Sequence, residues 1–154
     1  MEIENKLREL GQELPSAPAP VANYVGAVQT GNLVYVAGHV PILPDGSYLH
    51  LGKLGTQVTL EEGYDCARLC ILNCLASLKV AIGDLDRVQR VVKLLCMVNC
   101  TPDFKDSPRV ANGASDLLVE VYGESGRHAR SAVGMGSLPD TVPVEIEMIV
   151  ELKA

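Results

Sequence analysis

The sequence predicts a single α+β domain in which two long helices pack against one face of a sheet. Two observations support this class. Two segments with the apolar spacing of helices, residues 60–82 and about 107–122, are separated by one β-prone segment, and a pair of β-prone segments stands on either side of them. The 154 residues are enough for one domain with a substantial core.

The N-terminal residues are predicted to form a short helix outside this domain. Apolar residues recur at helical spacing within residues 2–13. The sequence PSAPAP at residues 15–20 breaks this helix and indicates an extended connector. We therefore divide the chain into a helical extension, residues 1–14, and a single domain, residues 15–154.

The first β-prone pair is predicted to be a hairpin. The apolar segments YVGAVQ, residues 24–29, and LVYVAGHVP, residues 33–41, flank a short turn at Thr30-Gly31-Asn32. A second turn is expected at Pro44-Asp45-Gly46, with a short strand beginning at Tyr48-Leu49.

Start and stop signals delimit both long helices. Thr59 and Glu62 form a predicted capping box at the start of the first, and Gly83 is a plausible C-cap. The β-branched segment VQRVVKLLCMVN follows as a strand. Asp106-Ser107-Pro108 is the start signal of the second helix, with proline in its first turn, and Gly123 ends this helix.

The C-terminal residues are predicted to form a second hairpin. In VPVEIEMIVEL, residues 142–152, every even position is apolar and three odd positions are glutamates, as in a strand with one buried face. The preceding segment, residues 127–135, joins it through Pro139-Asp140, taken as a two-residue turn. This pairing places Arg130 on the same face as Glu145.

Two interpretations of Arg130 and Glu145 remain open at this point. They are either ordinary solvated strand charges, whose cross-strand pairing is worth about a few tenths of a kcal/mol, or parts of a site. In the second case the guanidinium binds a planar carboxylate through two parallel hydrogen bonds, and the acid that faces it handles a proton.

Charge and composition weigh against two classes of partner. The net charge is -6 and the basic residues are scattered singly, whereas nucleic-acid binders usually carry a basic patch. No stretch approaches the ~20 uninterrupted apolar residues of a membrane helix. The N-terminal sequence resembles neither a signal nor a transit peptide, so a cytoplasmic location is expected.

The sequence predicts no metal site. Cys66, Cys70 and Cys74 recur on one helix face, but no CxxC pair and no neighbouring histidine completes a zinc ligand set. We interpret these cysteines as small buried residues of the core. The three histidines match no ligand motif and are interpreted as surface or hydrogen-bonded structural residues.

Several pieces of the sequence resemble the RidA/YjgF family, also known as L-PSP endoribonucleases. They are ANYVGAVQTGNLVYVAGHVP, the helix followed by GDLDRV and a strand, VANGASDLL, and above all ARSAVGMGSLPDTVPVEIE. The resemblance extends from about Pro18 to Leu152. It implies a chorismate-mutase-like fold, with a mixed sheet and two long helices on one face. It also implies a homotrimer whose sheets form an inner barrel, with sites in the clefts between subunits.

The resemblance further implies a reaction and its residues. Family members hydrolyse 2-imino acids to 2-oxo acids and ammonia without a metal or organic cofactor. Arg130 matches the arginine that binds the substrate carboxylate, and Glu145 matches the acid that positions water and relays a proton. Tyr24, Gly38 and Asn112 match residues that close or line the pocket.

Two positions depart from the family pattern. Ala37 stands where the deaminases have a serine, and Ala132 stands where many have a cysteine. Both changes remove a polar group from the expected substrate-binding pocket. Three functions are therefore considered: an imine deaminase, a trimeric protein that binds a small carboxylate without turnover, and an endoribonuclease. The acidic charge disfavours the last.

Overall fold

A computed structural model describes residues 1–154 and contains one five-stranded sheet. The strands are β1 (Ala27–Thr30), β2 (Leu33–His39), β3 (Val88–Asn99), β4 (Ala129–Met135) and β5 (Val144–Leu152). Their order across the sheet is β1-β2-β5-β3-β4. β3 and β4 run parallel, whereas the other neighbouring pairs are antiparallel, so the sheet is mixed.

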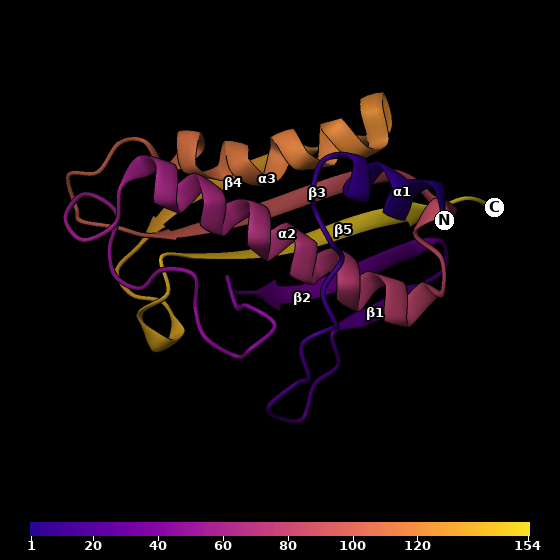
Figure 1. Ribbon diagram of the computed structural model, residues 1–154, viewed down its shortest axis with the longest axis horizontal. Coiled ribbons are helices and arrows are strands. Elements are labelled where there is room, and N and C mark those ends of the chain that lie inside the picture. The colour runs from indigo at the N-terminus through magenta and orange to yellow at the C-terminus, as the bar shows by residue number, and fades with distance from the viewer.

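Two long helices, α2 (Leu60–Ile82) and α3 (Ser107–Tyr122), cover one face of this sheet. Figure 1 shows both helices in front of the strands. α2 packs on β2 and β5, and α3 packs on β3 and β4. The predicted α+β architecture, with both helices on one face, is therefore confirmed.

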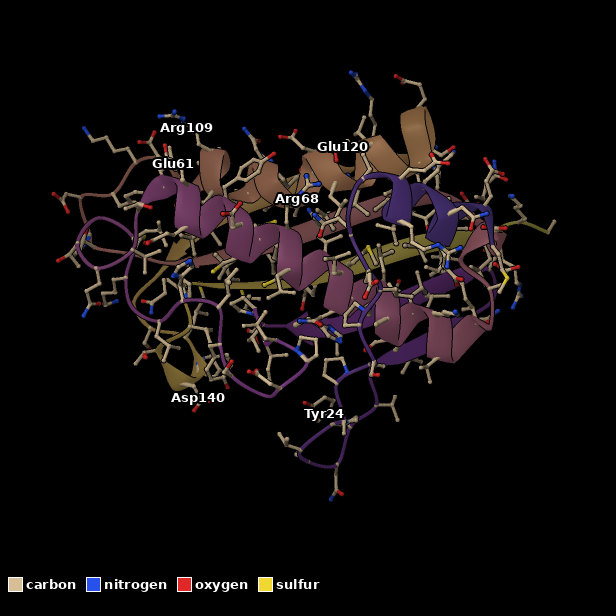
Figure 2. The ribbon with its side chains drawn as sticks, viewed as in Figure 1. Tyr24, Glu61, Arg68, Arg109, Glu120 and Asp140 are labelled. Atoms are coloured by element: carbon tan, nitrogen blue, oxygen red, sulfur yellow. The ribbon has the colours of Figure 1, made fainter.

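The start of α2 is fixed by the predicted capping box. The Thr59 hydroxyl accepts the Glu62 N–H at 3.1 Å, and the Glu62 carboxylate accepts the Thr59 N–H at 2.9 Å. Farther along, Arg68 of α2 forms an ion pair with Glu120 of α3, with an N–O distance of 2.9 Å (Figure 2). This pair lies on the outer side of the helical layer.

The N-terminal helix α1 (Glu2–Glu9) is shorter than the predicted segment 2–13. The chain leaves the helix at Gly11, whose positive φ of 71° a glycine adopts without steric cost. Ile3 and Leu7 nevertheless reach the main core. The predicted helix therefore exists, but its last turn does not form.

Asp86 anchors α1 to the domain. Its carboxylate accepts the backbone N–H groups of Glu2 at 2.8 Å and Ile3 at 2.9 Å, a cap supplied by a residue distant in sequence. The bond from Ile3 is the main cause that lowers the pKa of Asp86 to about 2. The division of the chain between residues 14 and 15 stays a prediction.

The predicted C-terminal hairpin is wrong. β4 and β5 do not pair, because β3 lies between them. α3 carries the chain from β3 to its parallel neighbour β4, and a 3-10 turn at Pro139–Thr141 leads on to β5. The short strand expected at Tyr48-Leu49 is also absent as a strand, and Tyr48 instead makes an isolated bridge with Ile42.

The core lies between the helices and the sheet, and it contains the cysteines. All five thiols are free and buried, and for Cys66, Cys70 and Cys74 this agrees with the predicted packing role. Burial raises the pKa of Cys66 and of Cys96 to about 12, so both remain protonated and unreactive at neutral pH. None of the helices combines the length and apolar content that crossing a bilayer requires.

Candidate functional site

A cavity of about 320 Å³ opens beside the end of β2. Three residues predicted for the site, Tyr24, Gly38 and Glu145, line it together. The remaining walls come from the proline-rich segment before β1, the loop after β2 and the turn before β5; they include Pro18, Pro20, Ala37, His39, Ile42, Tyr48 and Asp140. Figure 2 shows Tyr24 and Asp140 along the same lower side of the molecule.

Gly38 makes room for the Glu145 carboxylate. A Cβ atom at Gly38 would lie 3.2 Å from Glu145 Cδ and 3.3 Å from Oε1, which is tighter than ordinary van der Waals contact. Glu145 is half-buried, and this burial raises the pKa of its carboxyl, with a smaller contribution from the like charge of Glu147. The cavity therefore holds an acid whose pKa is shifted toward neutrality.

The turn before β5 forms the rim of the cavity. The Tyr48 hydroxyl donates to Asp140 Oδ2 at 2.5 Å. Asp140 and Thr141 have φ values of 53° and 60°, in the left-handed region that non-glycine residues seldom occupy. A strained turn thus holds the two polar groups at the mouth of the cavity.

Arg130 belongs to a second group of predicted residues, on the other side of the sheet. Its Nη1 donates to Asn112 Oδ1 at 2.9 Å and to Ser115 Oγ at 3.1 Å, both on α3. Ala132 lies two residues farther along β4 and packs, partly buried, against the core. Arg130 and Asn112 therefore meet within one chain, in contact with the helical layer.

The prediction that Arg130 and Glu145 share a face is wrong. Residues directly opposite each other on neighbouring strands point to the same face, and residues along a strand alternate. Arg130 stands opposite Leu94 of β3, whereas Glu145 stands opposite Met97, three positions away with no bulge between them. Arg130 thus lies on the helix-covered face and Glu145 on the open face, and one chain does not bring them together.

The open face of the sheet is largely apolar. Val28, Tyr35 and Val133 project from it with 54%, 46% and 41% of their surface exposed. Over its middle lies a concave region of about 570 Å³, lined mainly by apolar side chains that include Val28, Tyr35, Leu95 and Ile149. Contiguous exposed apolar surface of this kind marks an interaction site in soluble proteins.

Two residues of the Arg130 group were not predicted as site residues. Ser115 Oγ lies 2.9 Å from His128 Nε2, and His128 Nδ1 lies 2.6 Å from the Gly126 carbonyl oxygen. Both were detectable by periodicity. Ser115 follows Asn112 by three residues on a helix, and His128 precedes Arg130 by two residues at a strand, so each shares a face with a predicted residue.

Comparisons with known proteins place the chain in a family. The family model described as "YjgF/chorismate_mutase-like, putative endoribonuclease" matches residues 4–152. The chain belongs to the RidA/YjgF family. Protein TCP17 of Trypanosoma cruzi is 47% identical over 151 residues, which cover 97% of this chain and 94% of that protein.

Two further relatives extend this comparison. The crystal structure of Atu1372 from Agrobacterium tumefaciens, a protein of unknown function, superposes with a TM-score of 0.92 at 45% identity, covering 99% of this chain and 93% of that one. A 2-iminobutanoate/2-iminopropanoate deaminase of Dermatophagoides farinae is 30% identical over 90% of this chain and 93% of its own length. The chorismate-mutase-like fold is thus shared over nearly the whole chain.

Proposed function

We propose that this RidA/YjgF-family protein hydrolyses reactive 2-imino acids to 2-oxo acids and ammonia, in clefts between the subunits of a homotrimer. The observation that carries the proposal is the division of the candidate residues. Glu145, Tyr24 and Gly38 line one cavity, whereas Arg130 and Asn112 lie on the opposite face of the same sheet. A complete site with a carboxylate anchor and an acid therefore requires a second copy of the chain.

The open sheet face supports such an assembly. Its exposed apolar residues would be removed from water between copies, which is the main driving force of association. β4 is an edge strand, so Arg130 stands at the border of the sheet, where a neighbouring chain can approach it. In the trimer, Arg130 of one subunit faces the Glu145 cavity of the next.

The chemistry needs orientation and proton transfer rather than a strong nucleophile. Arg130 holds the substrate carboxylate and so fixes the imine carbon relative to Glu145. A water held by Glu145 adds to the C=N carbon and loses a proton to the carboxylate. Glu145 returns this proton to nitrogen, which gives a carbinolamine. Glu145 then takes the proton of the new hydroxyl and passes it to the amine nitrogen as the C–N bond breaks, so that the C=O of the 2-oxo acid forms and ammonia leaves. The raised pKa of Glu145 suits a group that accepts and donates a proton near neutral pH.

A coupled assay tests this function. A pyridoxal-phosphate dehydratase generates 2-aminoacrylate from serine, and formation of the 2-oxo acid is followed above the spontaneous rate. We expect Glu145→Gln to lower kcat by about 10²–10⁴-fold and Arg130→Ala to lower kcat/KM by about 10–100-fold. Arg109→Ala is the matched control, since this exposed arginine of α3 pairs only with Asp106. Equal background rates for the wild-type protein and both site variants would reject the deaminase.

Subunit mixing tests the shared site separately. In the proposed scheme every site is impaired in a trimer of Arg130→Ala chains and in a trimer of Glu145→Gln chains. Where the two kinds of chain meet in a mixed trimer, one orientation of the pair gives a site with both wild-type residues. Random mixing of the two chains should therefore restore about a quarter of wild-type activity. No recovery in verified mixed trimers would show that each site uses residues of one chain, and a single-chain mass by light scattering would contradict the assembly itself.

A second function is favoured by Ala37, which lines the Glu145 cavity and offers no hydroxyl there. In this alternative the trimer binds a small carboxylate without turnover. Saturable binding of 2-oxo acids by a protein that leaves the imine hydrolysis rate at background would favour it over the deaminase.

A further inference from the structure

The guanidinium of Arg130 is held from one side only. Its Nη1 hydrogens go to Asn112 Oδ1 and Ser115 Oγ on α3, at 2.9 and 3.1 Å. Neither Nε nor Nη2 makes a hydrogen bond or an ion pair within the chain. This leaves the Nε–Nη2 edge, which carries two parallel N–H groups, available for a planar carboxylate.

The direction of each bond behind Arg130 is fixed by chemistry. The Gly126 carbonyl oxygen can only accept, so His128 Nδ1, 2.6 Å away, carries the hydrogen. Neutral His128 must then accept at Nε2, and the Ser115 hydroxyl donates to it across 2.9 Å. The oxygen of Ser115 keeps its lone pairs for Arg130. The hydrogen bonds therefore all run in one direction: Arg130 donates to Ser115, Ser115 donates to His128, and His128 donates to Gly126.

His128 is suited to remain an acceptor. Its ring is half-buried, and this burial lowers its pKa, an effect that the nearby positive charge of Arg130 strengthens. The imidazole therefore stays neutral at physiological pH. A serine hydroxyl without such a partner rotates freely and presents either its hydrogen or its lone pairs to the arginine.

We propose that Ser115 and His128 are positioning residues that orient Arg130 with its Nε–Nη2 edge toward the bound carboxylate. The contribution to substrate binding rests on the proposed function, but the orientation of Arg130 does not. Neither residue contacts substrate in this scheme, because both act through the guanidinium.

The orientation is tested directly by NMR of the arginine side chains. In the wild-type protein we expect resolved, slowly rotating Nη resonances for Arg130, because Nη1 is held by two acceptors. Ser115→Ala and His128→Phe should average these resonances, and Ser115→Thr, which keeps the hydroxyl, should retain them. Ser77→Ala is the matched control: it breaks the bond between Ser77 and His39, 2.7 Å long, which has no link to Arg130.

Substrate binding gives the second measurement. Ser115→Ala should raise KM for the imine, and Kd for pyruvate, by about 5–10-fold with little change in kcat, and Ser115→Thr should restore both. Unchanged Arg130 resonances in Ser115→Ala would overturn the positioning role even in an active deaminase. A wild-type protein that neither hydrolyses imines nor binds pyruvate would instead reject the proposed function, while the resonances would still report on the orientation.

Discussion

Two histidine–serine pairs have the same hydrogen-bond pattern at different places in the molecule. In each, Nδ1 bonds the carbonyl oxygen two residues earlier at 2.6 Å, and Nε2 meets a serine hydroxyl on a covering helix. His39 at the end of β2 bonds Ser77 of α2, and His128 before β4 bonds Ser115 of α3.

The two pairs differ in whether the serine makes a further hydrogen bond and in how exposed the histidine is. His39 is buried, with 7% of its surface exposed, and the Ser77 side chain makes no further bond. His128 is half-buried at the edge of the sheet, and Ser115 continues to Arg130. The same bonds therefore serve cohesion of strand and helix where they are enclosed, and orient a charged side chain where they reach the surface.

The largest expected difference between the two pairs is in the loss of stability when each histidine is replaced. His39→Ala leaves a cavity and an unpartnered Ser77 hydroxyl inside the protein, so it should cost about 3 kcal/mol. His128→Ala removes a half-exposed ring and should cost about 1 kcal/mol. Urea unfolding at one protein concentration measures both, because association shifts the midpoint. Equal losses, or a greater loss for His128→Ala, would contradict the assignment of His39 to cohesion.

The second prediction concerns pH. Burial lowers the pKa of both histidines in the folded protein, whereas the unfolded value is 6.5. As pH falls below 6.5, the histidines of the unfolded chain take up protons while those of the folded protein are still neutral. The folded protein therefore loses stability over the pH range between 6.5 and the lower pKa values of the folded state. Each histidine contributes a slope of at most about 1.4 kcal/mol per pH unit.

Substitution separates the two contributions to this slope. We measure the free energy of unfolding between pH 7.5 and 5. Its dependence on pH should become weaker in His39→Gln than in His128→Gln, because His39 is the more buried ring. Identical slopes in both variants would show that the two histidines are equally accessible to protons in the folded protein.

Local signals in the sequence predicted both long helices accurately. The Thr59–Glu62 capping box and Gly83 delimit α2 as predicted, and α3 ends at Tyr122 before Gly123. Capping, turn chemistry and periodicity act over a few residues, so the sequence displays them directly. The proline-rich segment also separates α1 from the rest, although α1 is a turn shorter than expected.

Strand neighbours were not predictable in this way. The predicted alternation of β5 is present, but alternation does not tell which strand lies beside it. The neighbour is β3, which lies between β4 and β5 and precedes both in sequence by about 30 residues or more. Because β3 lies between β4 and β5, Arg130 and Glu145 lie on opposite faces of the sheet. The family resemblance groups both residues with Tyr24, Gly38 and Asn112, and their role in a site stays a prediction. Their division into two clusters depends on strand order, which the resemblance was not used to derive.

The smallest expected effect concerns Glu145, in the cavity bordered by His39. Burial and the charge of Glu147 raise the pKa of Glu145 above its usual 4.5, so the folded protein binds this proton more tightly than the unfolded chain. Stability therefore falls as pH rises from 4.5 through the folded pKa, and the penalty persists at pH 7. Glu145→Gln should remove it and stabilise the protein by about 0.5 kcal/mol, a gain limited by the half-exposed position.

The matched control is Glu147→Gln, on the same face but exposed, which should change stability less at pH 7. Chemical unfolding at pH 7 and pH 4 distinguishes the cases, because the advantage of Glu145→Gln should shrink at pH 4, where the wild-type carboxyl is protonated. A Glu145→Gln protein that is both inactive and more stable would show that the acid is kept at the expense of stability. Destabilisation by Glu145→Gln would instead mean that the charged carboxylate holds the cavity together, and Glu145 would then belong with His39 among the residues that serve cohesion.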